Sequence, residues 1–86
     1  MNYKIEFSKV AEKALHKIPI AELKKIQKRI DKLATDPFSH DCKKIQGKDD
    51  IYRVRQGDYR ILYTVYNNKL IVLIVNIGHR KEIYKI

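Results

Sequence analysis

The sequence of 86 residues contains a single cysteine, Cys42, and no long apolar run. One cysteine excludes an internal disulfide and a cysteine-rich metal cluster, and it is typical of a reducing compartment. The longest apolar run, Leu70–Val75, has six residues, far fewer than the roughly 20 that span a membrane. Residues 1–9 alternate in polarity and do not form the apolar block of a signal peptide. We therefore expect a cytoplasmic protein without membrane association.

Acidic residues are also scarce. The chain has 10 Asp and Glu against 19 Lys and Arg, which gives a formal net charge of +9. Hydrophobic residues make up 44%, enough for a packed core, so the chain is not a disordered basic tail. The length allows one domain, over residues 1–86. A strongly basic domain favours a polyanionic partner, and nucleic acid is the first candidate.

Metal ligands are not clustered in the sequence either. The three histidines, His16, His40 and His79, are far apart, and Asp49-Asp50 is an isolated acidic pair. Neither pattern has the spacing of a zinc or calcium site. The sequence therefore predicts neither a bound metal nor a cofactor.

The first half of the chain has the periodicity of one strand and two helices. Residues 2–7 alternate as in a half-buried strand, and Ser8 is a typical helix N-cap. Apolar residues recur at helical spacing over 10–18 and again over 21–34, where Asp36-Pro37 ends the pattern. These two segments predict a helical hairpin. On the second helix we expect the basic side chains to face outward: Lys24, Lys25, Lys28, Arg29 and Lys32.

The second half changes to a period of two. After a polar loop over 38–50, strands are expected over 51–55, 58–66 and 69–77, with a further short strand over 81–84. The dipeptides Gln56-Gly57 and Asn67-Asn68 predict tight turns between them. The strand over 69–77 is apolar on both faces, which predicts a central position. The order β-α-α-β-β-β(-β) predicts an α+β fold, with the N-terminal strand and helical hairpin packed on a mainly antiparallel sheet.

Arginine is concentrated in this second half. Residues 1–44 contain ten lysines and one arginine, whereas residues 45–86 contain four of each. Arginine binds phosphate through two parallel hydrogen bonds, so arginines on strands indicate an anion site more strongly than lysines on helices. If Gln56-Gly57 forms the turn, Arg53 lies opposite Arg60, and alternation places Arg53, Arg55 and Arg60 on one face. Like charges in opposite positions destabilise a sheet, and such a pair is expected where an anion binds. The alternative is three solvated arginines.

The C-terminal segment adds candidate side chains. Gly78 follows the most hydrophobic strand and allows the chain to turn sharply, which would present His79, Arg80 and Tyr84 together. Tyr84 could equally cap the core, and an isolated histidine such as His79 is more often a surface residue. Ile71, Leu73 and Val75 form an apolar stripe that could belong to the core or to a partner-binding groove.

Two segments carry a family resemblance: residues 51–63, Ile-Tyr-Arg-Val-Arg-Gln-Gly-Asp-Tyr-Arg-Ile-Leu-Tyr, and residues 78–84, Gly-His-Arg-Lys-Glu-Ile-Tyr. They resemble the RelE/ParE superfamily of toxins from toxin–antitoxin pairs, and the RelE-type messenger-RNA endonucleases more closely. The resemblance implies cleavage of messenger RNA in the A site of the ribosome, inhibition of translation and neutralisation by a cognate antitoxin. It assigns the catalytic set by position: Arg53, Arg55, Arg60, Arg80 and Tyr84.

The chemistry of RNA cleavage leads to a hypothesis for the roles of these side chains. RNA supplies its own nucleophile, the 2′-hydroxyl, so cleavage requires no metal. Tyr84 would act as the base or orient the 2′-hydroxyl, Arg60 and Arg80 would stabilise the phosphorane, and His79 would be the backup acid. The expected RNA-binding residues are Arg53, Arg55, Lys48 and Lys81. Two alternatives remain, a ParE-like toxin that inhibits DNA gyrase without nuclease activity and a plain RNA- or DNA-binding module.

Overall fold

The computed structural model describes residues 2–45, 47 and 50–80. Its elements follow the expected order, with one additional short strand, β2. They are β1 (Lys4–Phe7), α1 (Lys9–Leu15), α2 (Ile20–Leu33), β2 (Lys43–Lys44), β3 (Tyr52–Gln56), β4 (Tyr59–Tyr66) and β5 (Ile71–His79). The predicted α+β class is confirmed. The strand expected over 81–84 lies outside the described residues, and β2 replaces part of the loop expected over 38–50.

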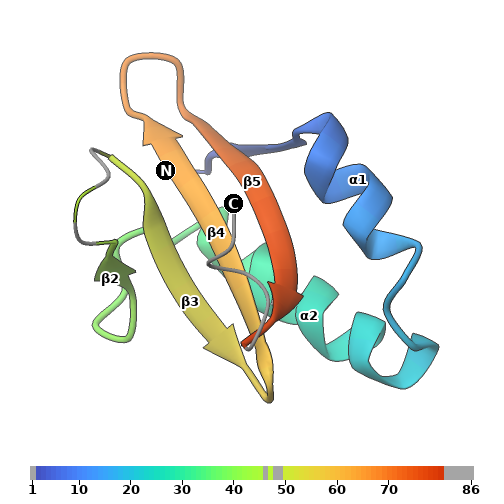
Figure 1. The fold of residues 1–86 in the computed structure, drawn as a ribbon. Helices are drawn as coiled ribbons and strands as arrows, with labels where there is room; N and C mark the ends of the chain where they lie inside the picture. Colours follow the sequence, from blue (N-terminus) through green and yellow to red (C-terminus); the bar gives the residue numbers. More distant parts are fainter. Residues whose placement is uncertain (1, 46, 48–49, 81–86) are drawn as a thin grey trace.

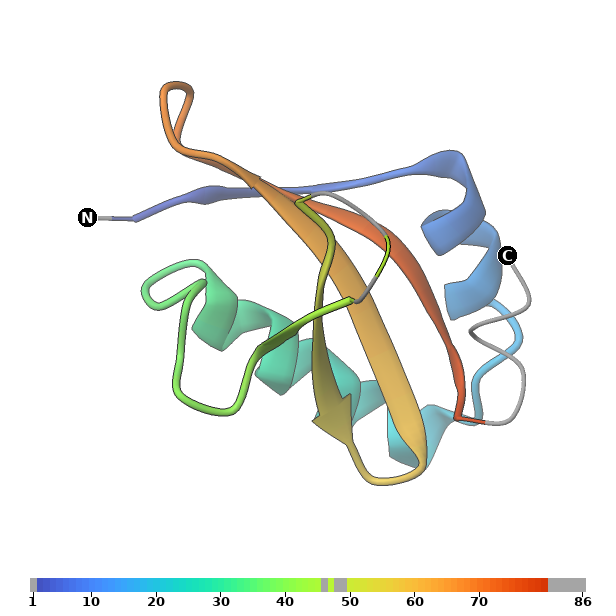
Figure 2. The same ribbon diagram turned by 60° about the vertical axis from the view of Figure 1, so that its left-hand side comes forward.

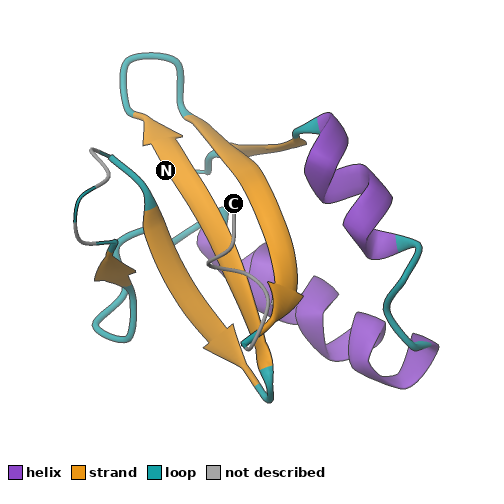
Figure 3. Cartoon of the chain, viewed as in Figure 1, coloured by secondary structure: helices purple, strands orange, loops and turns teal. Residues whose placement is uncertain are grey.

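The strands form one five-stranded sheet in the order β1-β5-β4-β3-β2. β1 pairs with β5 in parallel, and every other neighbouring pair is antiparallel. The apolar strand β5 was expected at the centre of the sheet; it lies between β1 and β4, so it is an interior strand, and the central strand is β4. In Figure 1, α2 passes behind β4 and β5, while α1 lies alongside β5. The turned view shows the twist of the β4–β5 pair, and a short connection joins the two helices (Figures 2 and 3).

Capping and apolar spacing explain why the helices form where they do. The Ser8 hydroxyl oxygen accepts a hydrogen bond from the Ala11 backbone N–H at 3.0 Å, which confirms the predicted N-cap. The same hydroxyl donates to the Val75 carbonyl at 2.7 Å and so attaches the start of α1 to β5. On α2, Ile26, Ile30 and Leu33 are fully buried and form the stripe that packs on the sheet.

The hydrophobic core lies between the helices and one face of the sheet. From the strands it takes Val54, Ile61, Tyr63, Val72, Ile74 and Ile77. Tyr63 is fully buried, and its hydroxyl donates to the Pro37 carbonyl at 2.6 Å. Burial raises the pKa of the Tyr63 phenol far above its usual range. This tyrosine therefore stays neutral and connects the central strand to the segment that follows α2.

The turn between β3 and β4 lies one residue later than predicted. Gln56 pairs with Tyr59, so the two turn residues are Gly57 and Asp58, and Gly57 supplies a positive φ of 60°. Arg55, rather than Arg53, is therefore directly opposite Arg60. Because the shift moves each partner by two positions, every side chain keeps its predicted face.

The turn expected at Asn67-Asn68 is also longer than predicted. Residues 67–70 form a four-residue turn, and β5 begins at Ile71 instead of Lys69. Leu70, the last of the four, has a positive φ of 54°. Further along, Leu62 pairs with Asn76 while Tyr63 pairs with Ile74, so Val75 is an extra residue in a bulge of β5.

Candidate nucleic-acid interface

Four basic residues share the sheet face that points away from the helices. Val54 and Ile61 pair with each other and belong to the core, so alternation directs Arg53, Arg55 and Arg60 to the other face. This confirms the predicted clustering of the three arginines. Lys43 of β2 pairs with Arg53, and directly opposite residues share a face, so Lys43 joins them. We call these four residues the cationic face: Lys43, Arg53, Arg55 and Arg60.

The cationic face contains two like-charge pairs in directly opposite positions. Lys43 faces Arg53 across β2 and β3, and Arg55 faces Arg60 across β3 and β4. Each such pair destabilises the sheet by some tenths of a kcal/mol. In the described part of the chain, the two ion pairs are Lys4–Glu6 and Arg29–Asp41, and neither involves the cationic face. The face therefore has a concentrated positive charge that a bound polyanion would neutralise.

Arg60 is the most unusual member of this face. It lies on the central strand and is only 8% exposed. Its Nε and Nη1 atoms are buried and have no hydrogen-bond partner among the described residues. Its neighbour on β5 is Gly78, which has no side chain to occupy the adjacent space. Because a buried, unpaired charge is costly, this arrangement favours an anionic ligand that supplies the missing acceptors.

Arg80 is tied to the same end of the sheet by its backbone. Its N–H donates to the Asp58 carbonyl at 2.8 Å, which connects the end of β5 to the β3–β4 turn. Asp58 is two residues before Arg60, so the structure brings Arg80 near the arginines of the cationic face. The Arg80 side chain is exposed. This location fits a second cation near a phosphate bound at Arg60.

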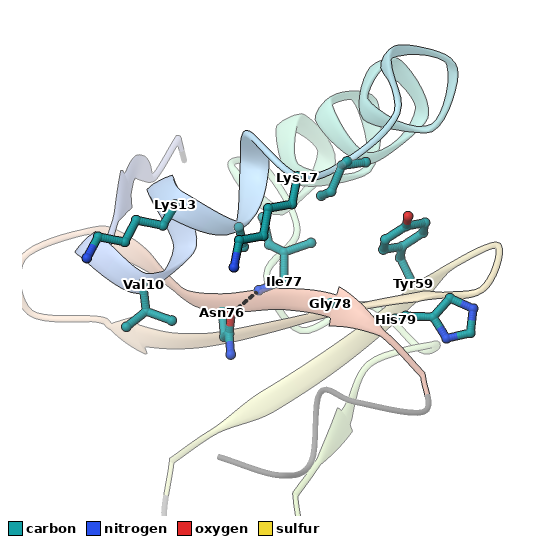
Figure 4. Close-up of a pocket in the computed structure, with 10 residues that line it drawn as sticks. Val10, Lys13, Lys17, Tyr59, Asn76, Ile77, Gly78 and His79 are labelled. Carbon is teal, nitrogen blue, oxygen red and sulfur yellow. Dashed lines mark hydrogen bonds between the residues drawn. The ribbon is translucent and has the colours of Figure 1, made fainter.

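His79 lies on the opposite face. It pairs with Tyr59, and the two rings meet edge to face with centroids 5.9 Å apart. Both line a pocket of about 430 Å³ between α1 and β5, together with Lys13, Lys17 and Asn76 (Figure 4). Alternation therefore places His79 on the face opposite Arg53, Arg55 and Arg60, and its role as backup acid stays a prediction.

Three other predicted site residues, Lys48, Lys81 and Tyr84, lie outside the described residues. In the apolar stripe, Ile71 and Leu73 pair with Tyr66 and Thr64 on the face away from the helices, so they are not part of the helix-facing core. Within residues 2–45, 47 and 50–80, no group of three or more His, Cys, Asp or Glu side chains could hold a metal ion. No helix in these ranges is long and apolar enough to cross a bilayer.

The expectation that Arg29 faces outward is wrong. Arg29 is 8% exposed, and its Nη2 atom donates to both carboxylate oxygens of Asp41, at 2.9 and 3.0 Å, and to the Ser39 hydroxyl at 3.2 Å. The Ser39 hydroxyl in turn donates to Asp41, and this hydrogen bond, followed by the Arg29 charge, holds the pKa of Asp41 below its usual value. We call Arg29, Ser39 and Asp41 the clasp, because they attach the loop after α2 to that helix.

Comparison with known proteins gives one consistent family. The family model that describes the ParE toxin of type II toxin–antitoxin systems matches residues 5–84. The putative toxin RelE1 of Methanocaldococcus jannaschii is 35% identical, with 99% of this chain and 98% of the relative aligned. The mRNA interferase toxin RelE of Escherichia coli K12 is 26% identical over 98% of this chain and 92% of its own length.

Solved structures show the same fold. The chain is similar to a chain of the archaeal RelE–RelB complex from Pyrococcus horikoshii OT3, with a TM-score of 0.79 and 30% identity over 93% of this chain and 97% of that one. It is also similar to a chain of the RelBE2 toxin–antitoxin complex from Mycobacterium tuberculosis, with a TM-score of 0.82 and 25% identity over 93% and 100% of the two chains.

Proposed function

The chain belongs to the RelE/ParE family of toxins from type II toxin–antitoxin systems, and we propose that it is an endoribonuclease toxin that cleaves messenger RNA and inhibits translation. The observation that carries the nuclease assignment is Arg60, a buried guanidinium whose Nε and Nη1 have no partner among the described residues. It lies among other cations, and a surface with a purely structural role would avoid their mutual repulsion. A phosphate of the message would supply its missing acceptors.

The reaction that suits this site is attack by the RNA's own 2′-hydroxyl. The 2′-oxygen loses its proton and forms a bond to the adjacent phosphorus, and the bond from phosphorus to the 5′-oxygen breaks. The leaving 5′-oxygen takes up a proton. The products are a 2′,3′-cyclic phosphate and a 5′-hydroxyl, so the reaction needs neither a metal nor an activated water.

The positions of the arginines on the sheet support the proposed roles. Arg60 binds the scissile phosphate and stabilises the extra negative charge of the phosphorane. Arg80 stabilises the charge that develops on the leaving 5′-oxygen, and a solvent proton completes the step. Arg53 and Arg55 hold the substrate phosphates. Tyr84, assigned by the family resemblance, orients the 2′-hydroxyl or accepts its proton.

The ribosome has a defined place in this mechanism. The cationic face consists of lysine and arginine side chains, whereas histidines and carboxylates are the groups that most often accept protons in enzymes. A ribosome that positions the message in its A site supplies the in-line geometry that a small protein lacks, and orientation alone accounts for a large part of many rate enhancements. The lysines on the helices would then contact ribosomal RNA through salt-sensitive interactions.

The physiological partner of the toxin is a cognate antitoxin protein, in keeping with its similarity to toxins of RelE–RelB and RelBE2 complexes. A domain with a net charge of +9 is bound well by an acidic or amphipathic segment. We place the toxin in the cytoplasm, where messages, ribosomes and a protein antitoxin meet.

The test is message cleavage in a reconstituted translation reaction. The purified toxin is added to ribosomes that translate a defined message, and both RNA ends are mapped and their end groups identified. Wild type should cut within codons and leave the 2′,3′-cyclic phosphate and 5′-hydroxyl. Arg60→Met and Tyr84→Phe should cut much more slowly.

Other outcomes would overturn the proposal. Intact messages together with inhibited DNA gyrase would favour the ParE-like activity, which the name of the matching family model also suggests. Binding of RNA without cleavage or gyrase inhibition would favour a plain binding module. Cleavage that persists in Arg60→Met would leave the nuclease in place but remove Arg60 from it.

A further inference from the structure

Lys43 belongs to the cationic face by its position in the sheet, although the family resemblance assigns it no role. It lies on the two-residue strand β2 and pairs with Arg53. Its neighbour Lys44 pairs with Tyr52, which packs against the core on the helix side. The two lysines are both exposed and carry the same charge, yet alternation directs them to opposite faces.

The position of β2 places Lys43 beyond the scissile phosphate. Neighbouring strands lie about 4.8 Å apart, so β2 and β4 are separated by about 10 Å. Arg53 occupies the strand between them, in direct opposition to Lys43. A phosphate bound at Arg60 on β4 would therefore be close to Arg53 and Arg55, and Lys43 would reach the next phosphate along the RNA.

The charges on β2 and β3 support a substrate track, by which we mean an RNA backbone that crosses these strands. Lys43 opposite Arg53 is an unfavourable pair, and neither residue takes part in an ion pair within the described part of the chain. A surface arranged for stability would place an acidic or neutral residue at one of these positions. A polyanion that crosses the strands would neutralise this pair and the Arg55–Arg60 pair together, because its phosphates recur along the backbone.

We propose that Lys43 binds a message phosphate adjacent to the scissile one, so that the RNA backbone crosses the sheet from β4 towards β2. This inference rests on the proposed nuclease function and assigns its substrate track. Lys43 makes the same contact before and during the reaction, so it contributes to binding and not to the rate of the chemical step.

The first experiment compares Lys43→Ala with Lys44→Ala in single-turnover cleavage of a message on programmed ribosomes. Lys43→Ala should raise the toxin concentration for half-maximal rate by roughly five- to tenfold, the loss expected for one charge-assisted contact, and leave the saturating rate unchanged. Lys44→Ala should match wild type, and Lys43→Arg should restore most of the binding. Thermal unfolding of each variant checks the fold, and Lys43→Ala should be at least as stable as wild type because it removes a repulsive pair.

The second experiment locates the contact on the RNA. Methylphosphonate linkages, which carry no charge, replace one message phosphate at a time around the cleavage site. A neutral linkage at the phosphate that Lys43 binds should lower the affinity of wild type to that of Lys43→Ala. Neutral linkages elsewhere should leave the difference in affinity between wild type and Lys43→Ala unchanged. The proposal predicts that this phosphate neighbours the scissile one.

The outcomes separate this inference from the function on which it rests. If wild type does not cleave messages, the nuclease assignment fails, and the substrate track fails with it. If wild type cleaves and Lys43→Ala behaves like Lys44→Ala, the nuclease assignment stands and the role of Lys43 is wrong. A fall in the saturating rate of Lys43→Ala with unchanged half-maximal concentration would also contradict a pure binding role.

Discussion

Arg29 and Arg60 are buried to the same extent, with 8% of each residue exposed, but their surroundings are opposite. In the clasp, Arg29 donates to Asp41 and Ser39 and so attaches a loop to α2. On the cationic face, Arg60 lies opposite another arginine, and two of its nitrogens have no partner among the described residues. Burial alone therefore does not reveal what a charged residue does, whereas the number and kind of its partners do.

The comparison separates stability from function. Removing one partner of a buried ion pair destabilises the folded structure, and a buried charge without partners reduces stability until a ligand binds. Arg60 also faces Arg55, which adds repulsion to the cost of burial. We infer that the clasp stabilises the fold and that the cationic face is maintained, at some cost in stability, for its anionic ligand.

The largest expected effect is on cleavage by Arg60→Met. Methionine fills a similar volume without the charge, so the variant should fold while its saturating cleavage rate falls by about 10²-fold or more, as for loss of a group that stabilises transition-state charge. The measurement is single-turnover cleavage on programmed ribosomes. Arg29→Met, examined as folded protein, should cleave at the wild-type rate, and equal losses in both variants would abolish the distinction between the two arginines.

Next in size is the loss of stability in Arg29→Met. This substitution removes the hydrogen bonds to Asp41 and Ser39, and because the Asp41 side chain is 48% exposed, its remaining charge is partly solvated. The free energy of unfolding in urea should fall by about 1–2 kcal/mol. A variant as stable as wild type would show that the clasp contributes nothing measurable.

A smaller effect of opposite sign is expected for Arg55→Thr. Threonine suits a strand and removes the repulsion between Arg55 and Arg60, so the free energy of unfolding should rise by about 0.5 kcal/mol. The same variant should need more toxin for half-maximal cleavage because a phosphate contact is lost. If stability decreases instead, the Arg55–Arg60 pair is not repulsive in the free protein.

The smallest effect concerns acid sensitivity. The Ser39 hydroxyl and the Arg29 charge lower the pKa of Asp41 in the folded protein, so the ionised carboxylate stabilises the fold. This contribution is complete above the unfolded pKa of about 3.9 and is lost as the pH falls through the lower, folded value. In urea unfolding from pH 6 to pH 3, Asp41→Asn should therefore show a shallower loss of stability than wild type. Parallel curves of unfolding free energy against pH would contradict the stabilising role of the ionised Asp41.

The faces of the sheet could be predicted from sequence, although the register could not. Alternation along β3 and β4 depends only on a period of two, and the misplaced turn moved each partner by two residues, so Arg53, Arg55 and Arg60 stayed on the predicted face. The same alternation also predicts the face on which His79 lies. It follows the core residue Ile77 by two positions, and so its side chain belongs on the helix side.

Other features depend on contacts that a periodic pattern does not contain. Arg29 lies beside the apolar stripe of α2, but its burial depends on Asp41, which is 12 residues away in a loop. Lys43 joins the cationic face only because β2 pairs with β3, and a strand of two residues has no detectable period. Both cases required the tertiary fold to bring charged residues together.

Whether Arg60 is kept for a ligand is tested most directly by the unfolding free energy of Arg60→Met in urea, with Arg29→Met measured beside it. Both substitutions replace an equally buried arginine by an apolar side chain of similar size, so they differ mainly in the partners that are lost. We predict that Arg60→Met is as stable as wild type or more stable, while Arg29→Met is less stable. A loss in Arg60→Met as large as that in Arg29→Met would contradict it, because Arg60 would then be a structural residue.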